Sequence, residues 1–103
     1  MKALWIVYDI VLDGQIVALL DACGVAGFTR WPRLSGRGPV SGIRLDDHVW
    51  PGANAAVMTV QEDAVVANLM ARLQRLRDEE GTFTGVWAFT TPVLETLAPP
   101  PPG

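Results

Sequence analysis

The sequence has little cysteine, histidine or clustered positive charge. Among its 103 residues there is one cysteine and one histidine, and 8 Lys plus Arg stand against 11 Asp plus Glu. A single cysteine excludes an intramolecular disulfide framework and is typical of a reducing compartment, which predicts a cytoplasmic protein. The basic residues are spread between Lys2 and Arg77 without forming a cluster. Because phosphate backbones bind concentrated positive charge, we expect no nucleic-acid partner.

Long apolar runs are also missing. No stretch approaches the roughly 20 apolar residues that span a bilayer, so we expect no direct membrane insertion. Met1 and Lys2 followed by apolar residues could begin a signal peptide, but Asp9 and Asp13 interrupt the run and no small-residue cleavage site follows. We therefore interpret this segment as a strand. Half of the residues are hydrophobic, enough for one core without a metal or a disulfide.

The common catalytic motifs are absent. The sequence contains no Gly-x-Ser-x-Gly, no His-Glu-x-x-His and no Walker loop. Cys23 falls on the apolar stripe of a predicted helix, which favours a structural thiol over a Cys-His dyad with His48. We therefore expect that the chain is not a self-contained enzyme.

Apolar periodicity predicts four strands and two helices. Residues 3–8 form a nearly unbroken apolar run, typical of a strand buried on both faces. A helical stripe follows, for which Asp13 is the expected N-cap and Gly24 the left-handed stop. The remaining expected elements are strands over residues 27–34, 53–61 and 85–90 and a helix from Asp63 to Gly81.

This order predicts an α+β, ferredoxin-like βαββαβ sandwich, with an antiparallel four-stranded sheet and both helices on one face. The first and third strands are the most apolar and belong in the middle, whereas Pro32 and Pro92 place the other two at the edges. The second sheet face would be apolar and uncovered, which is rare in a monomer and favours a homo-oligomer. We expect one domain over residues 1–97 and a disordered Pro-rich tail over 98–103.

The segment between the two halves is long and polar. Residues 35–52 show no usable periodicity, and such a connection is often functional. Asp46, Asp47 and His48 offer oxygen and nitrogen donors that suit zinc, copper or nickel, although a closed site would need ligands from another subunit. Alternatively, the aspartates are solvated turn formers and His48 packs on Trp50.

A short glycine motif precedes these donors. Gly36, Arg37 and Gly38 combine glycines that allow close backbone approach with an arginine that can pair with an anion. The same three residues are also consistent with a plain turn.

Three segments resemble the PII signalling family. Residues 24–29 read Gly-Val-Ala-Gly-Phe-Thr, like the PII stretch between the first helix and second strand, and residues 36–38 match the Gly-x-Gly that opens the PII T loop within a one-residue offset. Residues 48–54 read His-Val-Trp-Pro-Gly-Ala-Asn, which resembles the signature of a PII-like subgroup associated with heavy-metal efflux systems. The resemblance covers roughly residues 2–94.

The resemblance implies a homotrimer of ferredoxin-like subunits with their open sheet faces packed together. It also implies small-ligand clefts between subunits and a T loop, here about residues 36–50, that engages a regulated partner such as a membrane transporter of a heavy-metal efflux system. Asp47 and His48 are then the candidate metal ligands. The candidate ligand-binding residues are Gly36, Arg37, Gly38, Arg44, Trp50 and Asn54.

Two departures from the PII pattern limit what the resemblance implies. Ordinary PII proteins hold nucleotide phosphates with a Gly-Asp-Gly-Lys type loop, whereas residues 79–82 read Glu-Glu-Gly-Thr, which argues against adenine-nucleotide binding. Residues 36–50 also lack tyrosine, so the uridylylation known in some PII proteins is not expected for this chain.

An enzymatic alternative is a small ferredoxin-like isomerase or cofactor-free monooxygenase. In that case His48 is the general base, and Asp47 tunes it in an apolar pocket.

Overall fold

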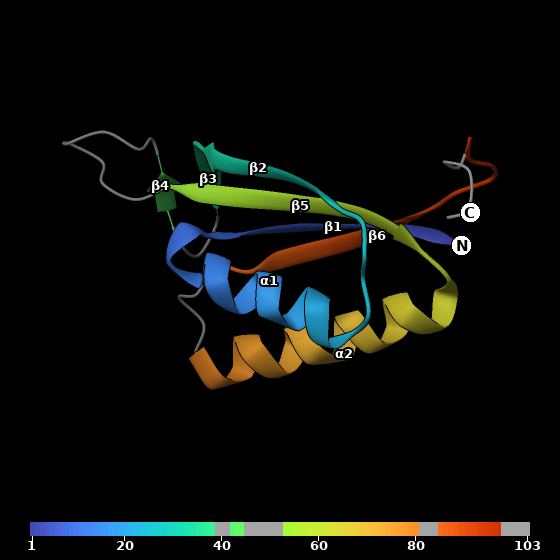
Figure 1. Ribbon diagram of the computed structural model, residues 1–103. Coiled ribbons are helices and arrows are strands. Elements are labelled where there is room, and N and C mark those ends of the chain that lie inside the picture. Colours follow the sequence, from blue (N-terminus) through green and yellow to red (C-terminus); the bar gives the residue numbers. More distant parts are fainter. Residues whose placement is uncertain (39–41, 45–52, 81–84, 98–103) are drawn as a thin grey trace.

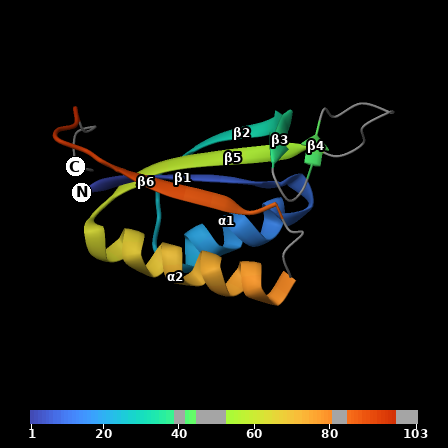
Figure 2. The same ribbon diagram turned by 180° about the vertical axis from the view of Figure 1, so that it is seen from behind.

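The computed structural model describes residues 1–38, 42–44, 53–80 and 85–97, with the side chains of residues 36–38, 42–44 and 80 left aside. One layer is a sheet and the other consists of two helices that cover a single face of it (Figure 1; Figure 2). The elements in chain order are β1 (Lys2–Asp9), the 3-10 helix η1 (Ile10–Leu12), α1 (Asp13–Ala22), β2 (Thr29–Leu34), β3 (Gly36–Gly38), β4 (Gly42–Arg44), β5 (Asn54–Gln61), α2 (Asp63–Glu80) and β6 (Trp87–Pro92).

The main sheet has the strand order β2-β5-β1-β6, and all neighbouring strands are antiparallel. The two most apolar strands, β1 and β5, therefore lie in the middle, as their composition predicts. The strands with prolines lie at the edges, where a missing N–H costs no ladder hydrogen bond. On β2 the register shifts between Trp31 and Leu34, around Pro32. The predicted ferredoxin-like arrangement is confirmed.

The core lies between the sheet and the helices. Alternation along β1 buries Leu4, Ile6 and Tyr8 completely on the helix side, because successive side chains point to opposite faces of a strand. The other buried members of this core are Leu12, Ile16, Leu20, Val25, Ala55, Val57, Val66, Leu69, Leu73 and Val86. The apolar stripes of both helices thus pack against one face of the sheet.

Gly24 ends α1 as the sequence predicts. Its φ of 77° is in the left-handed region that glycine adopts at low cost. The N–H of Gly24 donates to the carbonyl of Asp21, and the N–H of Val25 donates to that of Leu20, both over 3.0 Å. This pair of hydrogen bonds is a Schellman motif, and it directs Val25 into the core next to Leu20.

The start of α1 differs from the prediction, because Asp13 is not its N-cap. Leu12 holds that position without a side-chain hydrogen bond. The preceding turn η1 is capped instead by Asp9, whose Oδ1 accepts a hydrogen bond from the N–H of Val11 over 3.0 Å. The helix therefore begins at Asp13, one residue earlier than predicted. The Asp13 carboxylate is bonded to side chains of the sheet and not to the N-terminus of the helix.

Part of the segment between β2 and β5 is regular, which the sequence did not predict. β3 and β4 form a two-stranded antiparallel ribbon in which Arg37 is opposite Ile43 and Arg44 is opposite Gly36. The plain-turn alternative for residues 36–38 is therefore wrong. Strands of three residues are too short to produce a recognisable alternation of side chains.

The predicted tail, residues 98–103, lies outside the described residues.

Candidate functional site: the open sheet face and its loop end

A row of four aromatic rings crosses the face of the sheet that the helices leave open. Trp5 on β1 stacks on Phe89 of β6, with ring centroids 6.0 Å apart and an interplanar angle of 8°. Trp5 also stacks on Trp31 of β2 at 6.1 Å, and Phe89 contacts Trp87 at 4.9 Å. The order Trp31, Trp5, Phe89, Trp87 thus runs from one edge strand to the other. We call these four residues the aromatic row.

The register of the strands explains why the rings meet. Trp5 and Phe89 are direct cross-strand partners, and such pairs have their Cβ atoms about 5 Å apart. Between Trp5 and Trp31 lies β5, where the small Ala56 is the direct partner of Trp31. Ala56 is only 7% exposed although it lies outside the core cluster. The two indoles therefore meet above a residue that leaves them room.

Much of this row is exposed to solvent in the single chain. Trp87 is 60% exposed, Trp31 38% and Phe89 36%. Each exposed aromatic surface has a burial free energy of about 25 cal/mol per Å² when it is covered. Large contiguous apolar patches on a protein surface mark interaction sites. Chemically, the face can bind another apolar surface.

One end of the open face carries a buried polar atom without a partner. Asn54, the first residue of β5, is opposite Asp9 of β1 and Leu34 of β2. Its Oδ1 is buried and accepts no hydrogen bond from the residues that the structure describes. A buried acceptor left in this state costs about 1–3 kcal/mol. The arrangement therefore provides a place for an N–H or O–H donor at the end of the sheet from which the segment 35–52 emerges.

A charged cluster braces the same end of the sheet on the helix side. The Tyr8 hydroxyl donates to Asp13 Oδ1 over 2.6 Å. Arg30 of β2 donates from Nε to Asp13 Oδ1 over 2.9 Å and from a terminal nitrogen to Asp13 Oδ2 over 2.7 Å. Such a bidentate pair has a fixed geometry. The cluster therefore ties the edge strand β2 to the first turn of α1.

The cluster shifts the pKa values of its members. Burial, with the hydrogen bond to Asp13 and its negative charge, raises the pKa of Tyr8 to about 12. The hydrogen bond from Arg30 is the main cause that holds the pKa of Asp13 below its ordinary value, and the Tyr8 hydroxyl adds to it. The same pairing raises the pKa of Arg30. At neutral pH the cluster is an ion pair with a neutral phenol.

The residues predicted to bind ligands or metal are only partly placed. Gly36, Arg37 and Gly38 form β3 and Arg44 ends β4, so one ribbon brings the backbone of these residues together. Asn54 lies apart, where β5 begins. Trp50, Asp47 and His48 lie outside the described residues, so both the metal site and the enzymatic use of His48 stay predictions.

The described residues add two observations on metals and membranes. Within residues 1–38, 42–44, 53–80 and 85–97, no group of three or more His, Cys, Asp or Glu side chains could hold a metal ion. No helix among them is long and apolar enough to cross a membrane.

Sequence reasoning missed two features of this site. It predicted an apolar open face but not a continuous aromatic row, because the pairing of Trp5 with Phe89 depends on the register of strands far apart in the chain. It also did not identify a partner for Arg30. The only available signal was its place on an edge strand that also contains a proline, which does not identify Asp13 as a partner.

Comparison with solved structures identifies the fold. The chain is similar to the CPII protein of Thiomonas intermedia K12, described as a nitrogen regulatory PII-like protein bound to ADP, AMP and bicarbonate. The two chains are 22% identical with a TM-score of 0.72, and the match covers 87% of this chain and 82% of that one. The apo form of the same protein gives 22% identity and a TM-score of 0.67, covering 87% and 85%.

A second organism gives the same result. A protein described as PII-like and signaling, from Thermus thermophilus, is 24% identical with a TM-score of 0.63, covering 87% of this chain and 83% of that one. A scan against protein-family models and a search of curated proteins found no match. At these identities the likeness concerns the fold. The chain therefore has the ferredoxin-like fold that is found in PII-like nitrogen regulatory proteins.

Proposed function

We propose that this chain is a PII-like regulatory protein that assembles as a homotrimer through its open sheet face. In that assembly it binds a small ligand at the loop end of the sheet and presents the segment of residues 36–50 to a protein partner. The aromatic row carries the proposal, since Trp87, Trp31 and Phe89 are all exposed on one face of the isolated chain. The likeness in fold to PII-like regulatory proteins supports the same assignment by analogy.

Copies of the same chain are the simplest cover for the aromatic row. An apolar face on each copy can bury its counterpart on the others, and closed symmetry leaves none of these faces exposed. The helices lie on the opposite face of the sheet (Figure 2), so they remain outside such an assembly. Three of the four tryptophans lie in the aromatic row, and Trp50 falls outside the described residues.

The ligand that we propose is a small anion or an adenine nucleotide. The CPII structures hold ADP, AMP and bicarbonate, and each of these molecules has an N–H or O–H group that could satisfy the unpaired Oδ1 of Asn54. The sequence of the neighbouring ribbon also contains two arginines, Arg37 and Arg44. The absence of a lysine in residues 79–82 favours bicarbonate over a nucleotide.

Metal binding and a heavy-metal efflux partner remain predictions from the sequence. They rest on Asp47, His48 and the signature over residues 48–54. The descriptions of the CPII and Thermus structures name neither a metal nor an efflux system. The same structures are described as regulatory or signaling proteins, which does not favour the enzymatic alternative.

Regulation requires that the ligand binds different conformations of the segment with unequal affinity. A ligand shifts a conformational equilibrium only by its difference in affinity between the two states. The loop end of the sheet is suited to this role because Asn54 begins β5 a few residues after the segment, and Arg30 ties β2 to α1 before it. A ligand seated there could alter the segment without disturbing the core.

Calorimetric titration with ADP, AMP and bicarbonate, each alone, tests the ligand. We expect at least one of them to bind, and Asn54→Ala to weaken that binding about tenfold, the loss expected for one buried hydrogen bond. Asn68→Ala is the matched control, since Asn68 lies on α2 and its amide donates to Cys23 Sγ over 3.5 Å. Absence of binding by all three ligands, or equal weakening by both variants, would contradict the proposed ligand site.

A further inference from the structure

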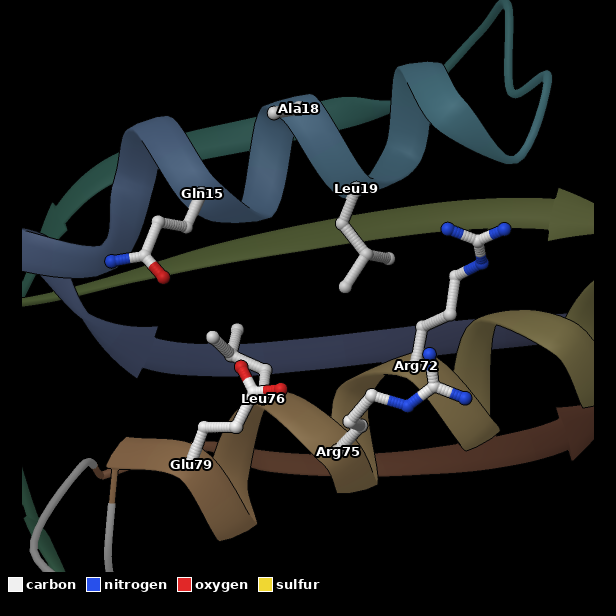
Figure 3. Close-up of a pocket in the computed structure, with 7 residues that line it drawn as sticks. All are labelled: Gln15, Ala18, Leu19, Arg72, Arg75, Leu76 and Glu79. Atoms are coloured by element: carbon white, nitrogen blue, oxygen red, sulfur yellow. The ribbon is translucent and has the colours of Figure 1, made fainter.

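The two helices leave a groove between them on the face of the molecule opposite the aromatic row. Its volume is about 370 Å³, which is within the range of small-molecule sites. The groove is lined by Gln15, Ala18 and Leu19 of α1 and by Arg72, Arg75, Leu76 and Glu79 of α2. Figure 3 shows Leu19 and Leu76 pointing into the space between the helices from opposite sides.

The lining is polarised along the groove. In Figure 3 the guanidinium groups of Arg72 and Arg75 lie to one side of the two leucines, the Gln15 amide lies to the other, and the Glu79 carboxylate overlaps Leu76. On α2 the separation of seven residues between Arg72 and Glu79 corresponds to about 10 Å along the axis. The groove thus has a cationic end, followed by the two leucines with the Glu79 carboxylate beside Leu76, and then the Gln15 amide.

The charged groups of the groove are available to a ligand. Within the described part of the chain, the ion pairs join the N-terminal ammonium to Asp63 and Arg30 to Asp13, and none involves Arg72, Arg75 or Glu79. Arg75 and Glu79 are four residues apart on one helix but do not pair with each other. The side chains of Arg72, Arg75 and Glu79 therefore have unused hydrogen-bonding capacity next to the two leucines.

We propose that this groove binds a small aliphatic amino carboxylate in extended form. Its carboxylate pairs with Arg72 and Arg75, because guanidinium groups bind carboxylates with charge-assisted hydrogen bonds. Its methylene chain lies between Leu19 and Leu76, and its ammonium group meets the Glu79 carboxylate and the Gln15 amide oxygen. The site is formed by one chain and lies on the helix face, so it does not depend on the assembly or on the ligand proposed above.

Titration of the whole chain with 6-aminohexanoate, followed by amide chemical shifts, tests the site. We expect saturable shifts at one molecule per chain, centred on the facing residues of α1 and α2. Hexanoate and hexylamine each offer one charged end only, and we expect both to bind at least tenfold more weakly. Equal affinity of either analogue would overturn the assignment of two charged ends.

Variants separate this site from general charge attraction. We expect Arg72→Gln with Arg75→Gln to weaken 6-aminohexanoate binding at least tenfold, and Glu79→Gln to weaken the amino carboxylate but not hexanoate. Arg77→Gln is the matched control, because Arg77 is an exposed arginine of the same helix outside the groove. All four residues are exposed, so the variants should fold. Absence of saturable shifts, or equal weakening by Arg77→Gln, would overturn the proposal.

Discussion

Tyr8 donates its hydroxyl hydrogen to Asp13 Oδ1 over 2.6 Å, which joins the end of β1 to the first residue of α1. Arg30 donates two further hydrogen bonds to the same carboxylate. Three elements therefore meet at one carboxylate, next to the end of the sheet where Asn54 lies. Because ionisable groups tie β2 to α1, the protonation of this cluster can be followed by titration.

The first prediction concerns ionisation of Tyr8. Because burial and the Asp13 carboxylate raise the pKa of Tyr8 to about 12, the folded chain retains the phenol proton after the unfolded chain has lost it near pH 10. Stability is therefore unaffected by this group below pH 10 and decreases as the pH rises from about 10 to about 12. Tyrosinate absorbance measures the effect directly, since Tyr8 is the only tyrosine.

The same titration in urea is the control for Tyr8. The unfolded chain should show a midpoint near 10, the ordinary value for tyrosine. A midpoint near 10 in the folded chain as well would show that the hydroxyl is not held by Asp13.

The second prediction concerns acid. Because Arg30 lowers the pKa of Asp13, the ion pair contributes stability above the ordinary pKa of aspartate, and this contribution is lost as the pH falls through the lower pKa of the folded chain. Arg30→Gln should move the titration midpoint of the Asp13 carboxyl upward, as measured by carbon chemical shifts. Arg77→Gln should leave it in place. If the midpoint of the Asp13 carboxyl is the same in Arg30→Gln as in the unchanged chain, the bidentate pair is ruled out.

The third prediction concerns the turn after α1. Gly24→Ala should destabilise the chain by about 1 kcal/mol, because alanine is strained at a φ of 77°. Gly27→Ala is the matched control, since neither position has an atom within 4 Å of an added Cβ and only Gly24 has a positive φ. Urea unfolding midpoints compare the two variants. Equal midpoints would mean that the left-handed turn is not required.

Much of the fold was predictable because it depends on local periodicity. The apolar run over residues 3–8 and the stripe from Ile16 to Leu20 specify a central strand and a covering helix, and Gly24 marks the end of that helix. Strand order followed from the prolines and the apolar content. In contrast, β3 and β4 are too short to show a period, and η1 changed the role of Asp13.

The candidate site was less predictable because it depends on contacts distant in sequence. Arg30 is 17 residues from Asp13, and the Trp5–Phe89 stack requires the pairing of β1 with β6. The groove between α1 and α2 depends on the spacing of two helices, which no single segment encodes. The sequence does indicate an apolar face that needs a cover, but the rings that form it become evident only from the register.

The central claim is that the aromatic row is buried between copies of the chain. Sedimentation equilibrium at micromolar concentration measures it most directly. We predict a particle of about three times the 11.1 kDa chain mass, and we predict that Trp87→Ser lowers the mass toward a single chain while Met70→Ser, at an exposed methionine of α2, does not. A wild-type particle with the mass of one chain would contradict the account.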